Sequence, residues 1–139
     1  MQNYKKEKSC GAIIYKKEND RLLFLLVQQK AGHYGFPKGH VEKNETEEET
    51  ALREIKEETN LDVKLDTRFR VVTTYSPIYN VMKDVVFFIG TPITNDIIAQ
   101  PEEIANIIWC EFEETQKILT HNDNKKIIKD ALNFIKNNN

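Results

Sequence analysis

The most informative stretch of this sequence is residues 39–61, which read GHVEKNETEEETALREIKEETNL. Thr46 followed three positions later by Glu49 is the pattern of a capping box, in which each side chain accepts a hydrogen bond from the other residue's backbone amide where a helix begins. We therefore expect a helix over about Glu47 to Thr59. Its apolar positions recur at helical spacing and predict the side that packs on the rest of the protein: Ala51, Leu52 and Ile55.

The same helix gathers carboxylates on one face. At 100° per residue, Glu54 and Glu58 differ by about 40° and Glu57 lies about 60° to the other side, so all three fall within an arc of about 100°. Like charges on one face repel, and a face that is only solvated would gain stability by carrying Lys there. Convergent carboxylates without a counter-charge suit a hard divalent cation, so this face predicts a Mg²⁺ site at which Mn²⁺ is a possible substitute.

Composition narrows the classes of function. The 139 residues carry a net charge of −2, which does not indicate a nucleic-acid or membrane partner. Residues 42–58 alone have a balance of −5, and the remainder has +3. A solvated helix face is the alternative explanation of that acidic stretch. No apolar run approaches the roughly 18 residues of a membrane span, and the N-terminus lacks the apolar centre of a secretory signal.

The Cys and His residues do not indicate a disulfide framework or a zinc site. Cys10 and Cys110 lie in apolar stretches, so we expect buried, reduced thiols and a cytoplasmic protein. The three His residues and two distant Cys residues have no recognisable zinc spacing.

The rest of the chain alternates between apolar strands and polar turns. Asn19-Asp20 predicts a turn between the first two strands, residues 31–39 predict a loop, and residues 125–136 predict an amphipathic helix. Such strands with two or three packed helices indicate one layered α/β (α+β) domain over residues 1–139. The predicted strands are residues 9–15, 21–28, 70–75, 82–89 and 107–112.

Residues 39–61 resemble the Nudix box, whose pattern is G-x5-E-x7-R-E-U-x-E-E-x-G-U with U apolar. Every position matches except the last Gly, which is Asn60 here. Asn is the next most common residue after Gly in the left-handed conformation that closes a helix, so we expect Asn60 to act as a cap remote from the carboxylates. The resemblance implies the family's α/β/α sandwich, with a mixed sheet and a loop–helix–loop catalytic motif, over roughly Lys8 to Phe134.

The resemblance also implies an activity, the Mg²⁺-dependent hydrolysis of a nucleoside diphosphate linked to another moiety. It implies four metal ligands, which are the Gly39 carbonyl and the side chains of Glu54, Glu57 and Glu58. Arg53 and Glu45 are expected to brace the loop–helix–loop motif by an ion pair.

The general base, or a further metal ligand, often comes from outside the box in this family. Glu103, just ahead of a predicted strand, is the best candidate in this sequence, and its neighbour Glu102 is a close rival. Within the box, Glu54 and Glu58 are also candidates for the base.

Two segments resemble the asymmetrical diadenosine tetraphosphate hydrolases within the family. They are residues 36–42, FPKGHVE, and residues 83–88, KDVVFF. Carried over by position, Lys38 and Lys83 hold phosphate oxygens and His33 faces the phosphate chain. By the same resemblance, adenine is expected to stack on Tyr75 or Tyr79. Phe87 stands where those enzymes often have Tyr, and because Phe87 and Phe88 alternate along a strand, one of them is expected in the core.

The best prediction of function is therefore the asymmetric hydrolysis of diadenosine tetraphosphate to ATP and AMP, with a small nucleotide as the substrate. Alternative enzymatic activities are pyrophosphohydrolysis of nucleoside triphosphates, of RNA 5′ ends or of diphosphoinositol phosphates. The charge balance outside the helix does not favour long RNA. A non-catalytic nucleotide-sensing module is the alternative of another class, and the intact set of glutamates argues against it.

Overall fold

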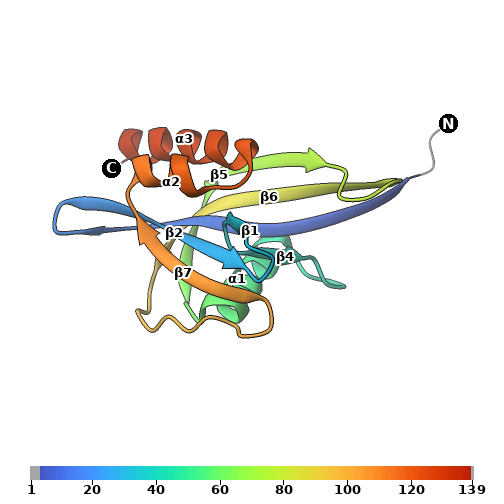
Figure 1. Cartoon of the computed structure of the whole chain (residues 1–139), viewed down its shortest axis with the longest axis horizontal. Helices are drawn as coiled ribbons and strands as arrows, with labels where there is room; N and C mark the ends of the chain where they lie inside the picture. The colour runs from blue at the N-terminus through green and yellow to red at the C-terminus, as the bar shows by residue number, and fades with distance from the viewer. Residues whose placement is uncertain (1–3, 139) are drawn as a thin grey trace.

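A computed structural model describes residues 4–138 of the chain. These residues form seven strands and three helices (Figure 1). In chain order these are β1 (Lys5–Glu18), β2 (Arg21–Gln29), β3 (Tyr34–Gly35), β4 (Lys38–His40), α1 (Glu47–Thr59), β5 (Val63–Tyr75), β6 (Val81–Pro92), β7 (Ile104–Cys110), α2 (Phe112–Ile118) and α3 (Asn122–Asn137).

The strands form one mixed sheet in the order β3-β2-β1-β6-β5, with β4 paired to β1 and β7 paired to β2. The long central pair, β1 and β6, is parallel, and the other pairs are antiparallel. Helix α1 lies on one side of the sheet, and α2 and α3 lie on the other (Figure 1). The expected α/β/α sandwich with a mixed sheet is confirmed.

Two hydrophobic cores lie on the opposite faces of the sheet. Side chains alternate along β1, so Cys10, Ala12 and Ile14 belong to the core under α1, whereas Ile13 belongs to the core under α3. Cys110 lies in the α3 core, so the two free, buried cysteines are on different faces, as expected of reduced thiols. The same alternation buries both Phe87 and Phe88, one in each core.

Helix α1 has the predicted bounds and the predicted capping box. The Glu49 amide donates to Thr46 Oγ1 at 3.1 Å, and the Thr46 amide donates to Glu49 Oε1 at 2.9 Å. Ala51 and Ile55 are buried as expected, but Leu52 is 40% exposed, so its place in the apolar stripe was wrong. Only one side of α1 packs on the sheet, and Leu52 lies just outside that arc.

Several element boundaries differ from those expected. The polar residues 5–8 extend β1 because they pair with the start of β6, and β5 begins at Val63 instead of residue 70. The predicted loop at 31–39 contains β3 and β4, whose partners are distant in sequence. Phe112 begins the short helix α2 and does not end a strand. Tertiary pairing decides such boundaries more than local propensity does.

The predicted turn and helix cap both use left-handed backbone. Asn19 and Asp20 have φ of 53° and 62°, as in the tight turn of a two-stranded hairpin. Asn60 closes α1 with φ 67° and ψ 5°, and its amide donates to the Lys56 carbonyl. Within residues 4–138, no helix combines the length and apolar content needed to cross a bilayer.

Candidate active site

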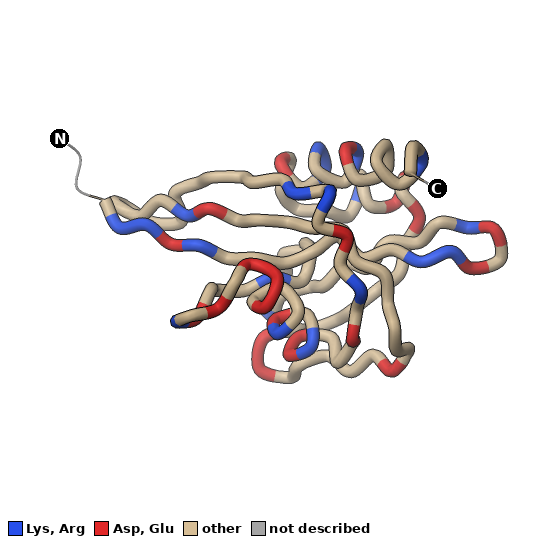
Figure 2. The backbone as a smooth tube through the Cα atoms, turned by 180° about the vertical axis from the view of Figure 1, so that it is seen from behind, with Lys and Arg blue, Asp and Glu red and all other residues tan. Residues whose placement is uncertain are grey.

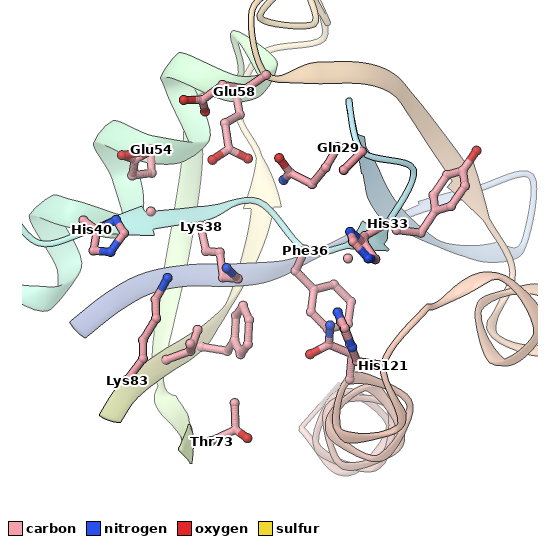
Figure 3. A pocket seen from close by; sticks show the side chains of 18 of the residues that line it. Gln29, His33, Phe36, Lys38, His40, Glu54, Glu58, Thr73, Lys83 and His121 are labelled. Carbon is pink, nitrogen blue, oxygen red and sulfur yellow. The ribbon is translucent and has the colours of Figure 1, made fainter. Parts of the chain in front are cut away.

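A cleft of about 850 Å³ opens where α1, β4, β6 and the start of α3 converge. Figure 3 shows Glu54 and Glu58 of α1 along one side, Lys38 and Lys83 next to them, and His33 and His121 across the cleft. The charged and aromatic residues that line it are His33, Tyr34, Phe36, Lys38, His40, Glu42, Glu54, Glu58, Tyr75, Lys83, Phe87, Glu102, Glu103, His121 and Asp123, together with Lys30. One depression therefore contains most of the site residues expected from the sequence.

Glu58 is the buried carboxylate of the cleft. It lies on the side of α1 that packs on the sheet, is 4% exposed, and its Oε1 has no hydrogen-bond partner. Burial raises the pKa of Glu58 to about 8, with the nearby Glu54 charge adding to the effect and Lys38 opposing it. A buried acceptor without a partner costs free energy, so this site is built for a group that supplies positive charge or a donor.

Gly39 makes room for the second carboxylate. A Cβ at Gly39 would lie 2.0 Å from Glu54 Cδ, which no real contact permits. Burial also raises the pKa of Glu54, and the Arg53 guanidinium opposes that shift. Strand β4 fixes the Gly39 backbone by its pairing with Cys10 of β1, so the Glu54 carboxylate packs directly against backbone.

Arg53 connects the loop before α1 to the acidic face. Its Nε donates to Glu45 Oε2 at 2.6 Å and its Nη2 donates to Glu45 Oε1 at 2.9 Å, so the expected ion pair is present. This bidentate contact holds the pKa of Glu45 at about 2. The Nη2 group also donates to the His40 carbonyl at 2.9 Å, which ties α1 to the end of β4.

Arg53 also changes the electrostatics expected of the acidic face. Its Nη1 lies 3.0 Å from Glu54 Oε1 and 3.2 Å from Glu57 Oε2, so these carboxylates do have a counter-charge, contrary to expectation. Glu57 is 54% exposed and does not line the cleft. Figure 2 shows the acidic positions gathered along α1 and the loop before it. In the described part of the chain, no three His, Cys, Asp or Glu side chains stand close enough to form a metal cluster.

The donor chemistry nevertheless fits a hard divalent cation. The groups at this end of the cleft are carboxylate and carbonyl oxygens, the ligands that Mg²⁺ prefers. Glu58 offers an unpartnered buried oxygen, and Glu54 is close enough for its charge to raise the pKa of Glu58.

Two lysines form the cationic middle of the cleft. Burial lowers the pKa of Lys38, and Glu58 and Glu54 oppose that shift. Burial also lowers the pKa of Lys83, followed by repulsion from Lys38. Lys83 is only 9% exposed, whereas Lys38 is half-buried. An anion between two ammonium groups that repel each other stabilises both.

Glu102 and Glu103 both line the cleft from the segment before β7. The charge of Glu103 raises the pKa of both Glu54 and Glu58. Its carbonyl accepts from the Lys30 amide at 2.9 Å, which fixes it to the end of β2. Glu103 is therefore close enough to the carboxylate end for its charge to act on both box glutamates.

The family model described as "NUDIX domain" matches residues 5–131. The chain belongs to the Nudix family. As a Nudix hydrolase it is 29% identical over 132 residues to the asymmetrical bis(5′-nucleosyl)-tetraphosphatase of Caenorhabditis elegans, covering 92% of this chain and 96% of that protein. It is 27% identical over 140 residues to the enzyme of the same name from Sus scrofa, covering 92% and 95%.

A solved structure agrees with these sequence relatives. The crystal structure of a C. elegans Ap4A hydrolase binary complex superposes on this Nudix hydrolase with a TM-score of 0.87 at 27% identity, covering 94% of this chain and 98% of that one. Fold and sequence therefore agree along almost the whole length.

The end of the cleft around His33 and His121, here called the aromatic end, contains residues that the sequence did not indicate. His121 stacks on His33 with ring centroids 5.6 Å apart and planes at 23°. His121, Asp123 and Asn124, at the start of α3, line the cleft. Their sequence gave no signal of this position, because only the packing of α3 on the sheet brings residues 121–124 to β3.

The two tyrosines predicted to stack on adenine differ in their position relative to the cleft. Tyr75 of β5 lines the cleft, whereas Tyr79 is 94% exposed in the β5–β6 connection and does not line it. The expectation that Tyr79 could stack on adenine is therefore wrong for this structure. The connection directs Tyr79 into solvent, which the sequence did not indicate.

Proposed function

We propose that this Nudix hydrolase cleaves diadenosine tetraphosphate asymmetrically, giving ATP and AMP, with Mg²⁺ as its cofactor. The observation that carries the proposal is the similarity to asymmetrical bis(5′-nucleosyl)-tetraphosphatases over more than nine-tenths of both chains. Relatives that share only the box would leave the substrate end of the cleft unaccounted for. Here the aligned region spans that end as well.

The carboxylate end of the cleft would hold the metal and the reacting water. Its metal ligands would be the Gly39 carbonyl with Glu54 and Glu58, and Glu57 would have to leave Arg53 to join them. When bound, Mg²⁺ neutralises charge on phosphoryl oxygens and lowers the pKa of a bound water. Glu103 is the preferred general base because its charge reaches Glu54 and Glu58, and the alternatives are Glu54, Glu58 and Glu102.

The remainder of the cleft would bind the dinucleotide. Lys38 and Lys83 would pair with phosphate oxygens, which relieves their mutual repulsion. His33 would face the same phosphate chain. Tyr75 would stack on adenine, since any base offers a π-face to an aromatic ring, and His121 lines the same cleft. Lys38 and Lys83 line the cleft next to the carboxylates (Figure 3), and we infer that they would hold the tetraphosphate off-centre relative to the reacting end.

Asymmetric attack predicts a specific pair of products. Diadenosine tetraphosphate with Mg²⁺ is expected to give ATP and AMP in equal amounts, with little ADP, as measured by anion-exchange chromatography of early time points. The physical reason is the off-centre seat, which presents an outer phosphorus of the chain to the activated water and withholds the central linkage.

A substrate panel tests the alternatives in the same assay. Each alternative substrate is assayed separately under the same conditions. The panel consists of nucleoside triphosphates, ADP-ribose, a 5′-triphosphorylated RNA and a diphosphoinositol phosphate. ADP as the main product contradicts asymmetric attack. Rapid hydrolysis of another panel member beside slow cleavage of the dinucleotide assigns that substrate instead. No metal-dependent turnover of any member favours the nucleotide-sensing alternative.

We also propose that residues 1–139 act as one Nudix domain in the cytoplasm. Both cysteines are buried and free, and burial raises the pKa of each thiol to about 11, which suits a reducing compartment. The proposed partner is the small nucleotide itself.

A further inference from the structure

The loop between β6 and β7, residues 93–103, carries Glu103 to the cleft. It runs beside the end of α1 and is attached there by hydrogen bonds at regular intervals. The Gln100 amide donates to the Glu58 carbonyl at 3.2 Å, and the Ile98 amide donates to the Thr59 carbonyl at 3.0 Å. Glu58, whose side chain is the buried carboxylate of α1, therefore also binds the loop through its backbone carbonyl.

The Asn60 side chain adds a third hydrogen bond between the end of α1 and the loop. Its Nδ2 donates to the Asp96 carbonyl at 2.9 Å. The left-handed backbone of Asn60 makes this possible, because it turns the chain away from the helix axis and directs the side chain toward the loop. The Gly found here in the box pattern has no side chain and would leave the Asp96 carbonyl without this donor.

Further hydrogen bonds within the loop connect Gln100 to Glu103. Gln100 accepts from the Glu103 amide through its side-chain Oε1 at 2.7 Å, and its carbonyl accepts from the Ile104 amide at 2.9 Å. The loop is also packed from beneath, because Ile97 and Ala99 belong to the core under α1. Because residues 96–103 are linked by these bonds, a displacement of the loop at Asp96 is expected to shift Glu103 as well.

We propose that Asn60 is a positioning residue for Glu103, holding the 93–103 loop against α1 so that the Glu103 carboxylate stays within reach of Glu54 and Glu58. This inference rests on the proposed function, since it gives Glu103 a part in the reaction. It assigns a role to the one box position at which this chain departs from the family pattern. The expectation that Asn60 serves only as a helix cap was therefore incomplete.

The test removes the amide and keeps the backbone conformation. Asn60→Gly retains the left-handed cap without strain, and Asn60→Asp keeps a residue that tolerates this conformation but cannot donate. Each variant is expected to lower kcat for diadenosine tetraphosphate by roughly three- to tenfold, the net worth of one hydrogen bond, with little change in KM. Asn19→Gly is the matched control, because Asn19 also has positive φ but lies in the β1–β2 turn, away from the cleft.

Amide hydrogen exchange, followed by NMR, measures the same tether without any turnover. In Asn60→Gly, the Ile98, Gln100 and Glu103 amides are expected to exchange several times faster, while the amides in the middle of α1 keep their rates. Unchanged exchange in the loop overturns the proposal. Faster exchange with unchanged kcat also overturns it, since the tether would then be structural only.

A double-mutant cycle distinguishes this route from any other. If Asn60 acts through Glu103, Asn60→Gly causes no further loss of kcat in a Glu103→Gln background. If the loss of kcat in the double variant equals the product of the two single losses, Asn60 acts by another route and the proposal is overturned. A Glu103→Gln protein with normal turnover overturns it as well. Absence of turnover in the wild-type chain refutes the proposed function instead, and the exchange rates still decide whether Asn60 holds the loop.

Discussion

Glu58→Gln is expected to lower turnover by at least about a hundredfold, the size usual for losing a metal-binding or general-base function. The fold should survive, because Gln has the same shape and removes a charge that burial disfavours. Mg²⁺ should raise the melting temperature of the wild-type protein and have much less effect on the variant. Glu48→Gln is the control, since Glu48 is an exposed glutamate of the same helix. Near-normal turnover of Glu58→Gln at saturating Mg²⁺ would show that its assigned role is wrong.

The same variant has a distinct pH dependence of stability in the absence of metal. The pKa of Glu58 is about 8 in the folded protein, against an ordinary value of 4.5. Folding therefore favours the protonated carboxyl, and the stability that it provides is complete below about pH 4.5 and lost as pH rises to about 8. The full difference is at most roughly 5 kcal/mol.

Urea unfolding in EDTA at several pH values measures this difference. Glu58→Gln should gain stability relative to the wild type between pH 5 and pH 8, by about 1 kcal/mol or more. Comparing the two proteins isolates Glu58 from the other carboxyl groups, such as Glu45, that titrate in both. A constant difference across this range would contradict the burial of an ionisable carboxyl at this position.

Gly39→Ala is expected to lose turnover about as severely as Glu54→Gln, on the order of a hundredfold, because a displacement of about 1 Å at a reacting centre has effects of that size. The new Cβ would lie 2.0 Å from Glu54 Cδ, so the carboxylate must leave its position. The melting temperature should change little, since the obstructing group is the end of a flexible side chain and Gly39 does not have positive φ.

Gly90→Ala is the matched control for this strand glycine. A Cβ at Gly90 would meet only ordinary contacts of 3.5 Å with Leu65 and Val63, so activity should be kept. In a Glu54→Gln background, Gly39→Ala should add little further loss, because both changes disable the same carboxylate. Full activity of a folded Gly39→Ala protein would mean that Glu54 is not needed where the structure places it.

Local patterns in the sequence determined the catalytic helix almost completely. The Thr46–Glu49 capping box and the left-handed preference of Asn60 depend on neighbours a few residues away, and both ends of α1 were predicted correctly. The family and the layered α/β fold also followed from the sequence, since the fixed spacing of the box and the apolar strands between polar turns require no knowledge of distant partners. Leu52 was the error in this region, because exposure depends on how wide a surface the sheet offers.

The tertiary structure decided which groups meet in the cleft and what their charges do there. Glu57 and Glu58 look equivalent in sequence, yet Glu58 is buried without a partner for Oε1 while Glu57 is exposed beside Arg53. His121 reaches the cleft only because α3 packs across the sheet. The contact of Asn60 with Asp96 joins residues 36 positions apart. Burial and long-range contact arise from packing between elements, so they are not encoded in any local spacing and appear only when the chain is folded.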